Sequence, residues 1–400
     1  MKKIWISLLL LAITGGIFVQ WKKTKIYLKE ETMLRHLKRE PFLNKPPAPW
    51  MLEQIEDDFQ GIGEISMAAI DAAFAEVKHL TPWVVRYRIM DNELYRYFVE
   101  GEPITLKDNS TEKAIKTLMQ KTCFPDMDFL ISYLDPFPFL PYPLNAPILV
   151  SAKLKNVPNG ILIPDWRSIG HWWMSDIKAV LKARIPWSMK KPFAIWRGSF
   201  TKAIREKLCQ LSFEHPDQLD ARLNQCPANK EQYRGERCSW DDFLACKYLP
   251  YVDGVMCAAP ALQWRLLSGS LTFKPDSEEI QWFYRALEPY VHFVPLKSDL
   301  SDLIEQLKWA QSHDSLCQEM ADKAALFAYD NLLYGDVLHY TSLVLKRYAT
   351  SQQIDSVTLR REIDGDPHWV NIQYRSSIRD QAEKCKDQSV KFCAESTPPN

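Results

Sequence analysis

The stretch "AIWRGSFTKAIREKL", residues 194–208, gathers residue types that suit the binding of a phosphate. Arg197 and Arg205 could donate charge-assisted, bidentate hydrogen bonds to a diphosphate, and the hydroxyls of Ser199 and Thr201 could donate as well. The pattern predicts a strand, a glycine-containing turn and a helix start, where free N–H groups and the helix dipole favour an anion. It contains neither a P-loop nor a dinucleotide fingerprint. By itself it fits an anion cradle and a solvated basic helix start equally well.

A carboxylate that could serve as a general base ends an apolar run earlier in the chain. The stretch "DMDFLISYLD" predicts a short strand that stops at Asp135 and opens into a loop rich in proline and aromatic residues. α/β proteins commonly build their sites where a strand ends in this way. An aspartate before "PFPF" also often caps a turn, so both interpretations of Asp135 stay open at this point.

Strands and helices alternate along the second half of the chain, and this alternation must position the arginines. The predicted strands are 193–199, 247–255, 270–274 and 291–296, and the predicted helices are 202–211, 260–269 and two more, capped by Ser298 or Asp299 and by Asp314. Strands that alternate with helices predict a parallel sheet built from doubly wound α/β units.

Several motifs, in the same order along the chain, resemble the family 90 glycosyltransferases. These include capsule-associated, lipopolysaccharide-modifying and protein O-glucosyltransferase relatives. The motifs are "DMDFLISYLD", "WRGSFTKAIR", "CKYLPYVDGV", "LLSGSLTFK" and "QWFYRALEPYVHFVPLKSDLSDL", and the resemblance covers residues 120–345. The resemblance implies an α/β fold of two facing Rossmann-like domains, the GT-B type. It also implies an inverting, metal-independent transfer from a nucleotide-diphosphate sugar, with no cofactor besides the UDP-sugar donor.

The resemblance also implies roles for individual residues. Asp135 falls where the family has its catalytic base, and Ser199 and Arg205 fall on positions that contact the donor diphosphate. Arg197 and Thr201 complete the same motif. The family's donor-binding loop falls on Met256, Cys257, Ala258, Ala259, Pro260 and Ala261. In an inverting transfer one carboxylate takes the proton of the attacking hydroxyl, while fixed cations stabilise the leaving diphosphate in place of a metal ion.

Two positions depart from the family pattern. Relatives usually end the donor loop in an arginine where this chain has Ala261, so an anion contact of about 1.5–3 kcal/mol is missing unless another group replaces it. Arg265, one helical turn later on the same face, could reach back. Animal relatives often carry a cysteine at the position of Ser268 that could pair with the one matching Cys246. That disulfide cannot form in this chain.

The composition is that of a globular protein with a large core, at 46% hydrophobic and 25% charged residues. Fifty basic and fifty acidic side chains cancel, so no overall charge attracts the chain to nucleic acid. Any recognition of a phosphate must therefore depend on local residues. The nine cysteines lack paired C-x-x-C spacing, which argues against a zinc site. Cys385 and Cys393 are a candidate disulfide if the body is exported, and buried thiols in a reducing compartment fit equally well.

The N-terminal residues predict attachment to a membrane. An apolar run from Ile4 to Val19, with lysines at both ends, favours an uncleaved single-pass anchor over a removed signal peptide. This predicts a location at the bacterial inner membrane or, in a eukaryote, on the ER or Golgi lumen side. The predicted parts are the anchor (1–23), a stalk (24–50), an acceptor-side α/β domain with the base (51–190), a donor-side α/β domain (191–350) and a polar tail (351–400).

The sequence therefore predicts an inverting glycosyltransferase that moves a hexose or pentose from a UDP-sugar to a hydroxyl of a surface glycan, a lipopolysaccharide or a protein. Ala261 keeps open a non-catalytic glycan-binding or scaffold protein with the same fold. A hydrolase would need two carboxylates that flank the scissile bond. Asp126 and Asp128 could join Asp135 in that role, but along one strand they share a face that Asp135 does not.

Overall fold

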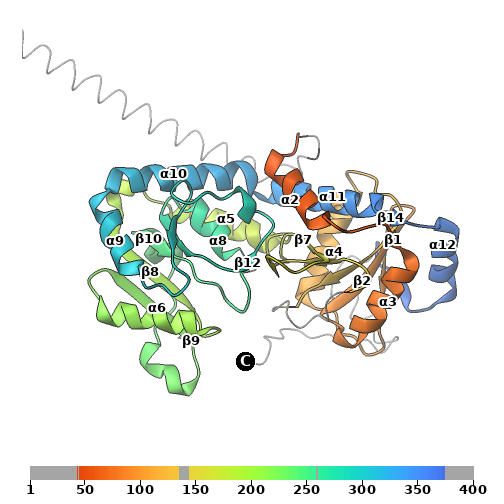
Figure 1. The fold of residues 1–400 in the computed structure, drawn as a ribbon, viewed down its shortest axis with the longest axis horizontal. Helices are drawn as coiled ribbons and strands as arrows, with labels where there is room; N and C mark the ends of the chain where they lie inside the picture. The colour runs from red at the N-terminus through yellow and green to blue at the C-terminus, as the bar shows by residue number, and fades with distance from the viewer. Residues whose placement is uncertain (1–42, 44, 135–143, 258–259, 374–400) are drawn as a thin grey trace, which may run out of the picture. The chain divides into compact units, whose positions relative to one another are not determined.

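The structure is a computed structural model that describes residues 43, 45–134, 144–257 and 260–373 of the chain (Figure 1). The described residues contain two larger sheets and the helices that cover them, in one unit that begins at Pro41. No helix within these ranges is both long and apolar enough to span a bilayer. The predicted anchor over 1–23 lies outside them and stays a prediction.

The first sheet has six strands in the order β15-β3-β2-β4-β5-β7 and is mixed. Its strands are β2 (Val84–Met90), β3 (Glu93–Tyr97), β4 (Met127–Ser132), β5 (Ile148–Val150), β7 (Gly160–Leu162) and β15 (Trp369–Asn371). Pairing is antiparallel from β15 through β4 and parallel from β4 to β7. The helices of this half are α2 (Pro49–Phe59), α3 (Met67–Val77), α4 (Leu106–Met119) and α11 (Tyr334–Thr350), which contacts α2 and α4.

The second sheet has five strands, all parallel, in the order β13-β11-β10-β8-β9. Its strands are β8 (Lys191–Ser199), β9 (Leu219–Gln225), β10 (Cys246–Pro250), β11 (Leu271–Pro275) and β13 (Val294–Leu296). The helices are α6 (Ala203–Glu214), α7 (Trp240–Leu244), α8 (Ala261–Leu267), α9 (Leu303–Ser312), α10 (Asp314–Asn331) and α5 (His171–Ala183), which contacts α7 and α8. The predicted α/β class, with a parallel sheet in the second half, is confirmed.

Two short pairings connect segments that are far apart in the sequence. In one, β1 (Ile65–Ser66) runs parallel to β14 (Gln352–Gln353). In the other, β6 (Lys153–Leu154) runs antiparallel to β12 (Glu279–Ile280). The second pairing joins the segment between β5 and β7 to the chain that follows β11.

The residues that follow α11 are part of the first sheet, although the sequence pattern predicts a polar tail from residue 351. Figure 1 shows α12 (Ser356–Gly365) beside β2 and α3, and β15 pairs with β3. The physical reason is a buried ion-pair cluster in which Trp369 lies over the guanidiniums of Arg86 and Arg88, 5.5 and 4.1 Å from its ring centre. Both arginines donate to Asp128 on the neighbouring strand, at 2.6–2.9 Å. Residues 374–400 lie outside the described part of the chain.

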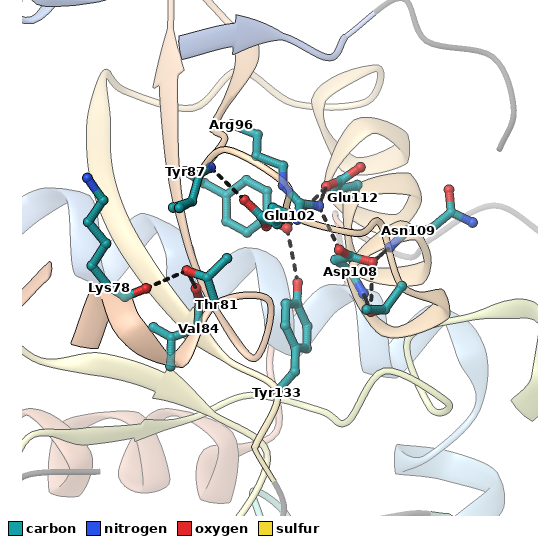
Figure 2. A network of polar contacts seen from close by, with 12 residues as sticks. Lys78, Thr81, Val84, Tyr87, Arg96, Glu102, Asp108, Asn109, Glu112 and Tyr133 are labelled. Atoms are coloured by element: carbon teal, nitrogen blue, oxygen red, sulfur yellow. Dashed lines mark hydrogen bonds and ion pairs between the residues drawn. The ribbon is translucent and has the colours of Figure 1, made fainter. Parts of the chain in front are cut away.

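A second buried polar network fixes α4 against β3 (Figure 2). Arg96 Nη1 donates to Asp108 at 2.7 Å and to Glu112 at 2.8 Å, and Nη2 donates to Glu102. All four side chains are at most 3% exposed. Tyr87 adds a hydrogen bond to Glu112 at 3.2 Å. One guanidinium therefore faces three carboxylates. Burial raises the pKa of Asp108 to about 6, against the lowering effect of Arg96 and with a further rise from Glu112.

The raised pKa of Asp108 predicts a specific dependence of stability on pH. The folded protein holds this proton more tightly than the unfolded chain, whose aspartates titrate near pH 3.9. The stabilisation that results from binding this proton is therefore fully present below about pH 4, and it is lost as the pH rises through about 6. D108N cannot ionise, so the unfolding free energy of the wild type should fall relative to D108N by about 3 kcal/mol at most over this window. Denaturant unfolding of both proteins across this pH range measures it, and a constant difference would contradict the assignment.

Candidate functional site

The carboxyl ends of β8 and β10 meet at the point where the strand order reverses. The chain leaves β8 through α6 to pair β9 on one side, and returns to place β10 on the other side of β8. In open parallel sheets, ligands bind at this reversal, outside the carboxyl ends of the strands. Ser199 ends β8, and Val252 to Gly254 follow β10. The predicted phosphate motif and the "VDGV" segment therefore lie side by side at the carboxyl edge of the parallel sheet.

Arg205 of α6 joins these two strand ends. Its Nη1 donates to the Ser199 carbonyl at 2.8 Å, its Nε to the Asp253 carbonyl at 2.9 Å, and its Nη2 to the Val252 carbonyl at 3.3 Å. The guanidinium also lies over the Trp196 ring, 5.5 Å from its centre. The Asp253 carboxylate is engaged elsewhere and accepts from Ser277 at 2.6 Å.

Arg205 occupies space that is free because residues 198 and 254 are glycines. A Cβ on Gly198 would lie 2.5 Å from the Trp196 ring and 3.2 Å from Arg205 Nη1. A Cβ on Gly254 would lie 3.1 Å from Arg205 Nη2. Both glycines are visible in the sequence, in "WRGS" and "VDGV", but only the tertiary structure assigns them to one guanidinium. The sequence pattern alone supports no more than a turn at Gly254.

Arg265 of α8 brings a second buried guanidinium to this region. It is 4% exposed, and it stacks on Trp264 at 4.3 Å. Its Nε donates to the Pro250 carbonyl at 3.2 Å, and its Nη1 donates to the Ala261 carbonyl at 2.8 Å. The side chain thus reaches back to the position where the family pattern has an arginine. Whether it binds a donor there stays a prediction.

The electrostatics of Arg205 and Arg265 differ from those of a structural ion pair. Neither guanidinium forms an ion pair with a carboxylate in the described part of the chain. Burial lowers the pKa of Arg265 to about 9; nearby Tyr251 opposes this shift, and the positive charge of Arg205 adds to it. Burial also lowers the pKa of Arg205, against the effects of Tyr251 and Asp253. The buried Arg265 guanidinium and the part-buried Arg205 guanidinium are thus supported chiefly by carbonyl dipoles rather than by hydrogen bonds to carboxylates of the described residues.

The other members of the predicted motif lie in different surroundings. Arg197 Nη2 forms an ion pair with Asp220 at 2.6 Å, and its Nε donates to the Glu236 carbonyl at 3.1 Å. The hydroxyl of Ser199 donates to Gln225 at 3.0 Å, and Thr201 is exposed. The structure therefore places the Arg205 guanidinium against the Ser199 carbonyl. The Arg197 guanidinium is paired with Asp220 instead.

The N-terminal turn of α6 contains Arg205 and also the carboxylate of Glu206. Its N-cap is Lys202, and no side chain accepts a hydrogen bond from the first turn. The first backbone N–H groups of a helix lack partners within the helix and carry part of its positive dipole. This end follows β8 directly, as the motif predicts, so it adds positive potential to the surroundings of Arg205.

The predicted donor loop is described at both of its ends. Met256 and Cys257 are buried, Pro260 is the N-cap of α8, and Ala261 is its first residue. Ala258 and Ala259 lie outside the described residues. Ser268 donates from its hydroxyl to the Arg265 carbonyl at 2.6 Å. The seven cysteines within the described ranges are free thiols, and no cluster of metal-binding side chains occurs there.

Asp135, the predicted base, lies outside the described residues, and its role stays a prediction. The two aspartates that could join it in a hydrolase have other partners. Asp126 accepts from the Ser356 hydroxyl at 2.6 Å and from the Asp91 backbone N–H at 2.9 Å. Asp128 is buried between Arg86 and Arg88. This engagement argues against a hydrolytic pair built from the three aspartates.

Comparisons with known proteins match most of the chain. The model of glycosyl transferase family 90 matches residues 45–398. Protein O-glucosyltransferase 3 of Homo sapiens is 30% identical over 294 residues, which cover 67% of this chain and 55% of that protein. Protein O-glucosyltransferase 1 of Bos taurus is 28% identical over 286 residues, which cover 66% of this chain and 71% of that protein. The chain therefore spans little more than half the length of the first of these relatives.

The close approach at Gly198 predicts that a single methyl group disturbs the surroundings of Arg205. G198A should force the Trp196 ring and Arg205 apart, and overpacking of this kind costs about 1–3 kcal/mol. Thermal unfolding should show a lower Tm for G198A. The matched control is G63A, because no atom lies within 4 Å of a Cβ built on Gly63. If both variants unfold at the wild-type temperature, Gly198 does not make room for Arg205.

Proposed function

Because this chain belongs to glycosyl transferase family 90, we propose that it is a transferase that moves a sugar from a UDP-sugar to a protein hydroxyl. The names of its O-glucosyltransferase relatives support glucose as the sugar and a protein as the acceptor, rather than a lipopolysaccharide or a surface glycan. We further propose an inverting, metal-independent transfer on two facing domains of the GT-B type, with the donor side on the parallel sheet.

The single observation that supports this proposal most strongly is the pair of arginines at the strand reversal, of which Arg265 is buried and Arg205 is part-buried. A guanidinium has five N–H donors. Arg205 uses three of its donors on backbone carbonyls, and Arg265 uses two. The remaining N–H groups have no acceptor within the described residues. A diphosphate would supply both the missing negative charge and acceptors for bidentate hydrogen bonds.

The proposed chemistry uses these fixed charges on the leaving group. As the bond between the sugar and the diphosphate breaks, negative charge grows on the UDP oxygens. Carbonyl dipoles already hold Arg205 and Arg265 in place, so stabilising that charge requires little reorganisation. In the proposed mechanism, Asp135 removes the proton of the acceptor hydroxyl, which attacks the sugar from the face opposite the diphosphate.

A non-catalytic glycan-binding protein with the same fold is the second candidate, since Ala261 replaces an arginine. The position of Arg265 weighs against this alternative, because its guanidinium lies at the Ala261 carbonyl. Incubation with a panel of UDP-sugars distinguishes the two. A scaffold would show neither nucleotide binding nor slow hydrolysis of any donor.

Substitution of Arg265 tests the proposed cradle. R265M should weaken UDP binding, measured by calorimetry, by about 1.5–3 kcal/mol, roughly a 10- to 150-fold rise in Kd. R265K keeps the charge and should retain part of the affinity. R197M is the matched control, because Asp220 already pairs with that guanidinium, so its Kd should change only a few-fold. Equal losses in R265M and R197M would contradict the distinction between the two arginines.

Substitution of Asp135 tests the proposed base. D135N should lower kcat by about 10²–10⁴-fold, the usual contribution of a general base. UDP binding should survive, because the diphosphate site is on the other half of the chain. D126N is the control, since Asp126 bonds only to Ser356 and Asp91 among the described residues, and it should keep the wild-type rate. Transfer at the wild-type rate in D135N would remove Asp135 from this role.

A further inference from the structure

The carbonyl of Cys257, at the start of the predicted donor loop, accepts hydrogen bonds from two side chains of different segments. Tyr251 Oη, just after β10, donates to it at 3.1 Å, and Gln281 Nε2, just after β12, donates to the same oxygen. Tyr251, Cys257 and Gln281 are each at most 3% exposed. A buried carbonyl with two side-chain donors fixes the backbone of that residue more firmly than a turn would.

A third side chain supports both donors. Tyr284 lies with its hydroxyl 3.0 Å from Tyr251 Oη, and Gln281 Nε2 lies 3.3 Å from the same Tyr284 oxygen. Because the single proton of Tyr251 goes to Cys257, Tyr284 must donate to the Tyr251 oxygen. The three side chains and the Cys257 carbonyl thus form one hydrogen-bonded network. Gln281 and Tyr284 belong to the motif "QWFYRAL", and Tyr251 directly follows β10.

The segment that carries Gln281 and Tyr284 is itself held on its other side. Trp282 is fully buried, 4.7 Å from the Tyr340 ring and 5.7 Å from the Trp50 ring. Arg285 forms ion pairs with Glu53 and Asp57 of α2. The hydrogen bonds at Cys257 therefore tie the donor loop to a packed aromatic cluster rather than to another loop.

We propose that Tyr251, Gln281 and Tyr284 form a positioning clamp that holds the start of the predicted donor loop, Met256 and Cys257, through the Cys257 carbonyl, in the conformation that binds the nucleotide diphosphate. This inference rests on the proposed function. The clamp fixes one end of the loop, and α8, which contains Arg265, fixes the other. A loop that is already in its binding conformation costs no ordering when the donor arrives. If losing the clamp leaves one molecule in ten in that conformation, the apparent Kd rises tenfold.

The test compares Y251F and Q281M with a matched control, Y340F. Tyr340 is also fully buried, but its hydroxyl has no hydrogen-bond partner among the described residues, so Y340F removes a hydroxyl without removing a hydrogen bond seen there. Calorimetry should show UDP binding about tenfold weaker in Y251F and Q281M and unchanged in Y340F. With a UDP-sugar that the wild type transfers, KM for the donor should rise by a similar factor while kcat stays near the wild-type value.

The outcomes separate the clamp from the proposed function. A wild type that binds UDP, with Y251F and Q281M that bind it equally tightly, would overturn the clamp and leave the donor site in place. A wild type that binds no UDP and no UDP-sugar would overturn the proposed function itself. If Y251F or Q281M fails to show a cooperative unfolding transition, Y284F provides the test, because it removes only the supporting hydrogen bonds. Its Kd should rise less than tenfold but measurably, and a wild-type Kd would again overturn the clamp.

Discussion

A part-buried guanidinium, Arg205, that pairs with no carboxylate of the described residues is the constraint around which the parallel sheet is arranged at its carboxyl edge. Carbonyl oxygens carry only partial charge, so several of them must converge to hold Arg205. The oxygens come from the ends of β8 and β10, which fixes how α6 leaves the first strand and how the chain leaves the second. The same guanidinium needs Trp196 beneath it, with Gly198 and Gly254 on either side.

The buried arginines of the first sheet, unlike Arg205, form ion pairs with carboxylates. Arg86 and Arg88 share the carboxylate of Asp128, and Arg96 contacts three carboxylates. Removing one member of such a cluster leaves an uncompensated charge, so these clusters lock strands and helices together. This contrast within one molecule separates arginines paired with carboxylates from arginines that donate to backbone carbonyls, the group to which we assign the proposed donor site. Arg197, with Asp220 beside it, belongs to the first group by its contacts.

The sequence predicted the local elements of the site and not the long-range pairings. The strand at β8, the helix at α6 and the turn between them follow from apolar spacing and glycine, which are local signals. The order of strands is not local, so the antiparallel part of the first sheet was not foreseen. Trp369 shows why: a polar stretch with one tryptophan resembles a tail until two arginines of β2 lie under its ring. The Cys257 hydrogen bonds were missed for the same reason, since Tyr251 and Gln281 are thirty residues apart.

Helix geometry bears on how Arg265 could serve in place of an arginine at residue 261. Side chains on a helix tilt toward its N-terminus, and residues four apart lie on the same face. The carbonyl of residue i−4 points along the helix toward residue i, so Arg265 Nη1 meets the Ala261 carbonyl on the side of α8 that follows the predicted donor loop. In the proposed site, the charge would therefore come from within α8, whereas in the family pattern it comes from the last residue of the loop. On this proposal, the donor requires a cation at this end of the loop, and the residue that supplies it can differ by a helical turn.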